Sequence, residues 1–443
     1  MPVHVLASPR FRSVVRETVG GLPRQFWWLW VSTLINRLGA FVVTFLALYL
    51  TVDRGYSTTY AGLVASLFGL GAAAASLVAG TLTDRVGRRP TLLLAQLGTA
   101  VFTAVLGFTD GQVAIAVVGF LVGFCNNATR PATSAIIADI VPAEDRVRAF
   151  SLNFWAVNLG FGLSSAVAGL IAVHGYLTLF LLDAATTLVC AVVIFIRIPE
   201  TRPDIPARQA EEPAVGLGTV FRDRRFMTVT GLNLLLAVVL QQGSTTLPMD
   251  MGRSGITPTE YGLVIGLNGV LIVLLQIPVT RWIEGRDRTA MLAAAALLIG
   301  WGFGLTALAG SSAWFFALTV AVWTVGEIFH TPTMMGVVAE LAPAHARGRY
   351  QGVFSLSWSL ASFIGPGVGG VLLGQGGWLL WGACGALGTV VATGFTVLRR
   401  RTAVTGAAGI ERIRVVAGAE ASAATPTAPA EAPAEAGKAS TGG

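Results

Sequence analysis

Five ionisable residues lie inside long apolar segments of this chain, and their types are those that carry protons or bind ions. They are Arg37, Arg130, Asp183, Glu327 and His330. A charge at the centre of a membrane costs several kcal/mol unless it faces a cavity or a partner, so these residues are candidate functional sites. Asp183 lies towards the outer end of its segment, and an interfacial position is its alternative.

Glu327 is the strongest candidate among them. It shares a helix face with His330, and Pro332 loosens the backbone just beyond. Burial favours the neutral form of a carboxyl group, so such a side chain can take up and release a proton near neutral pH. We predict that Glu327 is the proton or cation site, with Arg37 or Arg130 as its charge partner. The alternatives are a purely structural pairing for Glu327 and a packing role for His330.

The composition places these residues in a membrane protein. The chain is 54% hydrophobic and 12% charged, against about 25% charged in an ordinary soluble domain, and its mean hydropathy is +0.70. The net charge of +7 comes from arginines in short segments between apolar runs, which indicates membrane topology and excludes nucleic-acid binding. The three cysteines lie inside apolar runs without metal-site spacing, so we expect no disulfide and no metal site.

Twelve apolar runs are each long enough to cross a bilayer as a helix. They cover about residues 26–52, 58–81, 91–109, 112–141, 148–173, 176–198, 226–250, 258–283, 289–309, 312–341, 348–374 and 377–398. Arginines gather in the gaps after even-numbered spans, and the other gaps hold only Arg54 and Arg253. We therefore expect a multi-pass protein of the cell membrane with both termini in the cytoplasm.

The predicted all-α chain divides into five parts. Residues 1–25 are a cytoplasmic arm, 26–198 and 226–398 are six-helix halves, 199–225 are a proline-rich cytoplasmic linker, and 399–443 are a disordered tail.

The two halves are copies of one unit. Positions 59, 62, 63, 64 and 69 carry the same residues as positions 259, 262, 263, 264 and 269, and a spacing of 201 relates Pro131 to Pro332. Each half has six spans, an even number, so both halves begin on the same side of the membrane and are parallel repeats. That architecture is typical of secondary transporters, with the substrate site between the halves.

A charged stretch between the second and third spans carries a family signature. Its fixed positions are Gly80, Asp84, Arg85, Gly87, Arg88 and Arg89. They fill the pattern G-x-x-x-D-R/K-x-G-R/K-R/K of the major facilitator superfamily, and the chain resembles its twelve-helix drug:proton antiporters over about residues 20–400. The resemblance implies that this clasp, residues 80–89, ties the halves together on the cytoplasmic side, with Asp84, Arg88 and Arg146 as gating residues. The alternative is that its arginines only anchor the loop in the cytoplasm.

Two acids lie at the ends of the fourth and tenth spans, at corresponding depths. Asp139 is followed by a proline and two arginines, of which Arg146 is the first, and Glu340 is followed by a proline and two arginines, of which Arg347 is the first. These charges form either an interdomain network that rearranges during transport or solvated helix ends. Surface ion pairs add little stability, so their importance would lie in the choice between conformations.

A packing signature of the antiporters is intact in the eleventh span. It begins at Gly365 and Pro366 and ends at Gly369 and Gly370, whereas the fifth span has Ser164 at the corresponding start. We expect this segment and the clasp to be the contacting surfaces of one cytoplasmic gate.

Polar and aromatic side chains within the spans complete a candidate substrate cavity, although interhelical hydrogen bonds and packing are their commoner use. The candidates are Asn36, Asn126, Asn153, Asn158, Gln241, Gln242, Asn268, Trp155, Trp323 and Trp358.

Together these features predict a secondary active transporter of small amphipathic molecules that works by alternating access. Proton-coupled efflux, as in drug resistance or metabolite export, is the first expectation, and proton-coupled uptake is the alternative. A membrane-embedded enzyme or primary pump is a remote alternative, because the chain has no P-loop Gly-Lys-Ser/Thr. We expect a functional monomer in membrane lipid, with a small-molecule substrate, no nucleic acid and no cofactor beyond the proton gradient.

Overall fold

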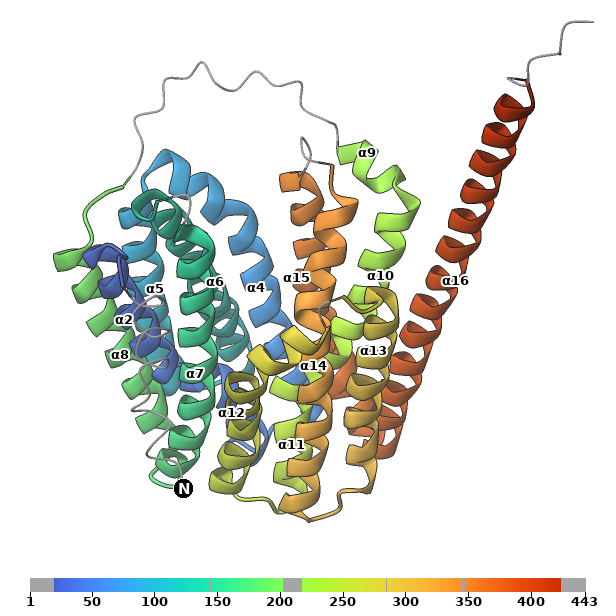
Figure 1. Ribbon diagram of the computed structural model, residues 1–443. Coiled ribbons are helices and arrows are strands. Elements are labelled where there is room, and N and C mark those ends of the chain that lie inside the picture. The colour runs from blue at the N-terminus through green and yellow to red at the C-terminus, as the bar shows by residue number, and fades with distance from the viewer. Residues whose placement is uncertain (1–19, 143–144, 202–216, 284, 344–346, 424–443) are drawn as a thin grey trace, which may run out of the picture. The chain divides into compact units, whose positions relative to one another are not determined.

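A computed structural model shows an all-α chain, as the sequence predicts (Figure 1). It describes residues 20–142, 145–201, 217–283, 285–343 and 347–423. Within these ranges, 12 helical segments are long and apolar enough to cross a membrane. The prediction of twelve spans is therefore confirmed.

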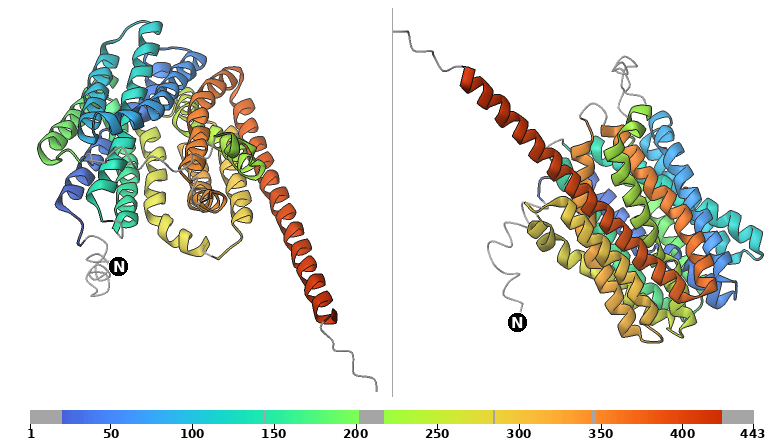
Figure 2. Two further views of the ribbon diagram at one scale, coloured as in Figure 1. Left: turned by 90° about the horizontal axis from the view of Figure 1, so that it is seen from above. Right: turned by 90° about the vertical axis from the view of Figure 1, so that its right-hand side faces the viewer.

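The helices form two groups that lie side by side when seen from above (Figure 2). The first half contains α2 (Arg24–Leu38), α3 (Phe41–Leu48), the π-helical turn η1 (Tyr49–Asp53), α4 (Thr58–Arg85), α5 (Arg88–Phe108), α6 (Gln112–Ile140), α7 (Arg146–Ala172) and α8 (Tyr176–Arg197). The second half contains α9 (Leu217–Arg222), α10 (Arg224–Leu240), the 3-10 turn η4 (Gln241–Ser244), α11 (Thr246–Arg253), α12 (Pro258–Ile283), α13 (Arg288–Gly304), the 3-10 turn η5 (Leu305–Leu308), α14 (Ala313–Leu341), α15 (Arg347–Gln375) and α16 (Gly377–Ala423).

Several helices begin where the sequence supplies a capping side chain. Ser57, Asp223, Asp287 and Ser312 each accept a hydrogen bond from the backbone N–H three residues later, at the starts of α4, α10, α13 and α14. Such a side chain satisfies a backbone donor that has no partner within the helix. Because successive spans alternate in direction, every loop lies at one of two ends. We call the end with residues 85–89 the clasp end, and the end with residues 53–58 and 253–258 the far end.

The first and seventh spans are broken, whereas the sequence predicts continuous helices. The first breaks between α2 and α3, where Gly39 lies so close to α8 that an added Cβ would be 1.9 Å from Thr186 Oγ1. The Asp183 carboxylate of α8 accepts a hydrogen bond from Val42 N at 3.1 Å, at the start of α3. The seventh span breaks at η4, between α10 and α11.

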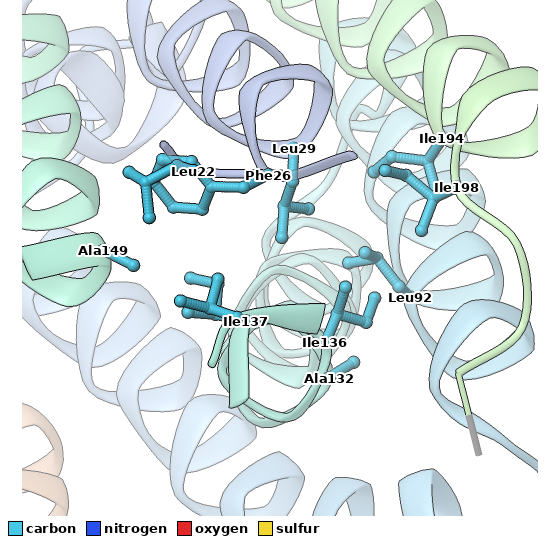
Figure 3. Close-up of a cluster of buried hydrophobic side chains, with 11 residues drawn as sticks. Leu22, Phe26, Leu29, Leu92, Ala132, Ile136, Ile137, Ala149, Ile194 and Ile198 are labelled. Carbon is cyan, nitrogen blue, oxygen red and sulfur yellow. The ribbon is translucent and has the colours of Figure 1, made fainter. Parts of the chain in front are cut away.

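An apolar core near the clasp end holds the first half together (Figure 3). It joins side chains from or beside α2, α5, α6, α7 and α8, namely Leu22, Phe26, Leu29, Leu92, Ala132, Ile136, Ile137, Val141, Ala149, Ile194 and Ile198. Because five helices share this cluster, the first half is a packed unit.

The predicted boundaries need two adjustments. The predicted linker, 199–225, contains the short helix α9 and the start of α10, while its residues 202–216 lie outside the described part, as do residues 1–19 of the arm. The structure is also helical to Ala423, where the sequence predicts a disordered tail from 399. This stretch is rich in alanine and arginine, which favour helix, and no proline follows until Pro426. Residues 424–443 lie outside the described part.

Candidate functional site

The two halves meet along two glycine-lined seams, one between α4 and α15 and the other between α7 and α12. In the first, a Cβ added at Gly62 would lie 2.5 Å from Pro366 O and 3.0 Å from Gly370 Cα. In the second, a Cβ added at Gly262 would lie 3.0 Å from Gly169 Cα. Small residues let helix backbones approach this closely within a membrane. The seams therefore depend on glycine at these positions.

Among the residues that the structure describes, three hydrogen bonds join the halves at the far end. Arg253 donates to Thr58 Oγ1 at 3.2 Å, Thr259 donates to Gly169 O at 3.0 Å, and Tyr261 donates to Thr44 O at 3.0 Å. Tyr261 is completely buried and its ring also packs edge-on against Phe45 of α3. The far end is thus closed by polar contacts as well as by glycine packing.

At the clasp end, the two predicted acids pair inside their own halves. Arg88 Nε donates to Asp139 Oδ2 at 3.1 Å within the first half. Arg288 Nη1 lies 2.5 Å from Glu340 Oε1 within the second half. These two pairs lie within the halves, so neither contributes to the interdomain network that was one of the two alternatives for Asp139 and Glu340.

Glu200, just after α8, explains why the clasp contains Gly87. Its carboxylate accepts hydrogen bonds from the backbone N–H groups of Arg88 at 2.9 Å and Arg89 at 3.2 Å, the first residues of α5. A carboxylate is favoured at this positive end of a helix. Gly87 has φ +122°, and an added Cβ would lie 2.6 Å from Glu200 Oε2. Sequence analysis missed Glu200, because its partners lie more than a hundred residues earlier.

The remaining clasp residues leave the gating role a prediction. Arg85 is exposed, and Arg146 is exposed and donates to a backbone carbonyl just after α6 at 3.2 Å. The side chains of Asp84 and Arg347 lie outside the described part of the structure, and Gly80 lies within α4.

The prediction that the clasp and the Gly365–Pro366 segment form one gate is wrong for this structure. Gln242 of η4 donates to Gly365 O at 3.1 Å, and Pro366 O faces Gly62. Gly62 and Gly80 both lie on α4, and at 1.5 Å per residue they are about 27 Å apart. A motif in the sequence does not reveal which level of the opposite helix it meets.

The predicted proton site consists of Glu327 on α14 and its partner on α12. Asn268 Nδ2 donates to Glu327 Oε2 at 3.1 Å and to Thr324 Oγ1 at 3.0 Å. Asn268 is buried and Glu327 half-buried. His330 is buried, and neither of its ring nitrogens has a hydrogen-bond partner in the described part of the chain. The structure joins Glu327 to Asn268, which sequence analysis had assigned to the substrate cavity.

Asp183, Arg37 and Arg130 occupy the corresponding depth of the first half. Asp183 is 6% exposed, and its bond to Val42 N gives it a structural role at the break in the first span. The guanidinium of Arg37 interacts electrostatically with both Asp183 and Arg130. The ion pairs found among the described residues do not join either arginine to Glu327, so that pairing stays a prediction.

Most predicted cavity amides join neighbouring helices, which was their alternative interpretation. Asn36 donates to Thr187 at 3.3 Å, Gln241 to Ser362 at 2.7 Å and Gln242 to Gly365 O at 3.1 Å, while Asn158 donates to Phe154 O of its own helix at 2.9 Å. Asn126 is half-buried, and Asn153 Oδ1 is buried without a partner among the described residues.

The three predicted aromatic walls have different surroundings. Trp323 is 5% exposed and stacks on Phe303 with ring centroids 5.1 Å apart, so it belongs to the core of the second half. Trp155 is exposed and Trp358 is half-buried. These two remain candidates for contact with a substrate.

Arg54 and Arg253, the two arginines in gaps otherwise free of arginine, both form contacts at the far end that the sequence did not predict. Arg54 donates to Tyr49 Oη at 2.6 Å and pairs with Asp110 at 2.7 Å, and Arg253 donates to a carbonyl of α15 as well as to α4. Asp250 of α11 accepts a hydrogen bond from Trp381 Nε1 at 2.8 Å.

Comparisons with known proteins agree with this architecture. The sequence model of the Major Facilitator Superfamily matches residues 29–251 and 244–431. The multidrug resistance protein MdtH of Citrobacter koseri is 24% identical over 85% of this chain and 95% of its own length. A Na(+), Li(+), K(+)/H(+) antiporter of Planococcus maritimus is 24% identical over 73% of this chain and 84% of its own length. The crystal structure of the peptide transporter POT in complex with sulfate has a TM-score of 0.73 at 17% identity, over 86% of this chain and 96% of that one.

Proposed function

The chain belongs to the major facilitator superfamily, and we propose that it exports small amphipathic molecules in exchange for protons by alternating access. The family and the relatives named above are transporters and not enzymes, as the sequence predicts. The chain is a multi-pass membrane protein. We place it in the cell membrane as a monomer, driven by the proton gradient without a cofactor.

Two relatives support export. One is named a multidrug resistance protein and the other a cation/proton antiporter. The likeness to a peptide transporter is at 17% identity and supports the fold alone. Uptake therefore remains the second candidate, and the direction of flux separates the two.

The observation that carries the proposal is the position of Glu327. This carboxyl lies 14 residues from the end of α14 at Leu341, which is about 21 Å along the helix and close to the middle of a membrane. Its hydrogen bond among the described residues comes from the neutral amide of Asn268, so the carboxylate can take up a proton without leaving a paired cation uncompensated. A site that loads and releases a proton at this depth can couple the gradient to the motion of the halves.

The contacts between the halves support an inward-facing conformation. The arginine distribution supports a cytoplasmic position for the clasp end. The seams and three hydrogen bonds join the halves towards the far end, which is then the outer side. Outward opening requires these contacts to separate.

The test uses everted and right-side-out vesicles with three fluorescent probes: 2-naphthoate, 2-naphthamide and 2-naphthylmethylammonium. Export predicts that at least one probe accumulates in everted vesicles and that collapse of the proton gradient stops it. Glu327→Gln should abolish this accumulation while binding persists, and Glu260→Gln, an exposed acid on α12, is the matched control. Unchanged accumulation with Glu327→Gln would refute the proton site. Accumulation in right-side-out vesicles alone would establish uptake.

A further inference from the structure

We infer that Arg37 and Arg130 form a subsite for the acidic group of an organic substrate: a carboxylate, sulfonate or phosphate. The inference deepens the proposed function and rests on it. Arg37 is half-buried and Arg130 is exposed. In the part of the chain that the structure describes, neither guanidinium forms a hydrogen bond or an ion pair. Arg37 interacts electrostatically with Asp183 and Arg130. Arginines inside membrane segments normally pair or face water, and these two present free donors.

The two arginines lie at the depth expected of a central substrate site. Arg37 is 13 residues from the start of α2 at Arg24, about 20 Å at 1.5 Å per residue. Arg130 is 10 residues from the end of α6 at Ile140, about 15 Å. Both ends lie at the clasp end, so the two positions are near the middle of a hydrocarbon core about 30 Å thick. Glu327, about 21 Å from the clasp end of α14, lies at a similar depth in the opposite half.

The packing around Arg37 fixes its position. A Cβ added at Gly160 of α7 would lie 2.5 Å from Arg37 Cβ, so α2 and α7 approach closely at this residue. Trp30 of α2, about two helical turns nearer the clasp end, also donates to a carbonyl of α7 at 2.8 Å. The base of the Arg37 side chain is therefore held between two helices, and less side-chain entropy is lost when its head binds a ligand.

The charges nearby leave the pair positive. The acid that acts on Arg37 is Asp183, and its carboxylate is already committed to Val42 N at the start of α3. One carboxylate beside two arginines leaves a net positive region. It repels a cation and attracts an anion, most strongly where water is scarce.

The chemistry of the guanidinium group selects oxyanions. Its planar fork of N–H donors matches the oxygens of carboxylate, sulfonate and phosphate groups, and such charge-assisted bonds are stronger than neutral ones. The proton and the substrate would then use different halves, with the proton on Glu327 and the acidic group on Arg37 and Arg130. A substrate of this kind has an apolar body with one acidic group.

The test measures binding, which needs no gradient. Purified full-length protein is titrated in chloride buffer with 2-naphthoate, 2-naphthamide and 2-naphthylmethylammonium, and tryptophan quenching reports affinity. We expect the anion to bind at least about tenfold more tightly than the neutral probe. Arg37→Gln and Arg130→Gln should each weaken binding of the anion about tenfold or more and leave the affinity for the neutral probe unchanged. Arg37→Lys should retain part of the affinity.

The control is Arg286→Gln. Arg286 is an exposed arginine on the loop before α13 that stacks on Trp282, so the substitution removes a positive charge at the clasp end and should change no affinity. The subsite is overturned if the anion binds no better than the neutral probe, if the cation binds best, or if neither substitution weakens the anion. If the binding measurements support the subsite but no vesicle accumulates a probe, export is refuted and anion binding still holds.

Discussion

The seam between α4 and α15 offers a test of how the far end stays closed. Gly62→Ala adds one methyl group where a Cβ would lie 2.5 Å from Pro366 O. Ordinary van der Waals contact begins at 3.4 Å, so the two backbones must separate by about 0.9 Å. The obstacle is backbone and cannot rotate away as a side chain would. The substitution should therefore disfavour the closed seam specifically.

The size of the effect follows from the cost of overpacking. Inserting a methyl group into a tightly packed contact costs about 1–3 kcal/mol. In the open state the methyl group meets no such obstacle, so this cost shifts the equilibrium towards opening by about 5–150-fold. Alanine also favours helix over glycine by roughly 1 kcal/mol in both states. Gly352→Ala on α15 supplies the control, since a Cβ there meets nothing within 4 Å.

The assay labels a cysteine placed in the seam. Ser66 on α4 is 4% exposed, and a Cβ added at Gly367 would lie 2.8 Å from its hydroxyl. Ser66→Cys, made in a background with the three native cysteines replaced, should react slowly with a membrane-impermeant maleimide while the seam is closed. Adding Gly62→Ala should speed the labelling by at least fivefold, and Gly352→Ala should leave the rate unchanged. Equal rates for the two glycine variants would refute the claim that this contact holds the far end closed.

Three further predictions follow from contacts outside the seams. Asp183→Ala should lower the free energy of unfolding by about 1–3 kcal/mol in detergent, because Val42 N–H is left buried without an acceptor. Asp183→Asn should keep most of that free energy, and equal losses for the two variants would contradict the structural role of this hydrogen bond. Arg253→Gln removes a bond between the halves and should speed far-end labelling with little change in thermal stability. Asp250→Leu should lower the melting temperature in detergent, because Trp381 Nε1–H is left buried without its acceptor, whereas Asp250→Asn should keep most of the stability.

The span count and the repeat were predictable because they depend on local composition. An apolar run of about 20 residues crosses a bilayer as a helix whatever its neighbours are. The breaks in the first and seventh spans were not predictable in the same way. The start of α3 is held by Asp183, 141 residues from Val42 in the chain, so the break is set by tertiary contact and not by the local sequence.

The candidate site was predictable in part for a similar reason. Glu327 stands out in sequence because a carboxyl is rare in an apolar run, but its partner Asn268 is 59 residues away and is one of many polar residues in the spans. Glu200 was missed because an acid at the end of a span is ordinarily expected to be a solvated charge. Its role appears only when the fold brings it to the start of α5, against Gly87.

The internal repeat also explains why there are two seams. A spacing of 200 relates Gly62 to Gly262, and a spacing of 201 relates Gly169 to Gly370. Each seam pairs the second helix of one half with the fifth helix of the other, so Gly62 faces Gly370 just as Gly262 faces Gly169. Two equivalent contacts on opposite sides of one interface must break together if the halves move as rigid bodies.

Gly262→Ala therefore tests rigid-body opening from the other side of the interface. A Cβ there would lie 2.4 Å from Ser165 O, an obstacle of the same kind as the one at Gly62. If the halves separate as units, this change should speed the labelling of Ser66→Cys in the first seam, although Gly262 lies in the second. The double variant with Gly62→Ala should then multiply the two single effects, because both costs act on one equilibrium. If labelling responds to Gly62→Ala but not to Gly262→Ala, each seam opens independently and the halves do not separate as rigid units.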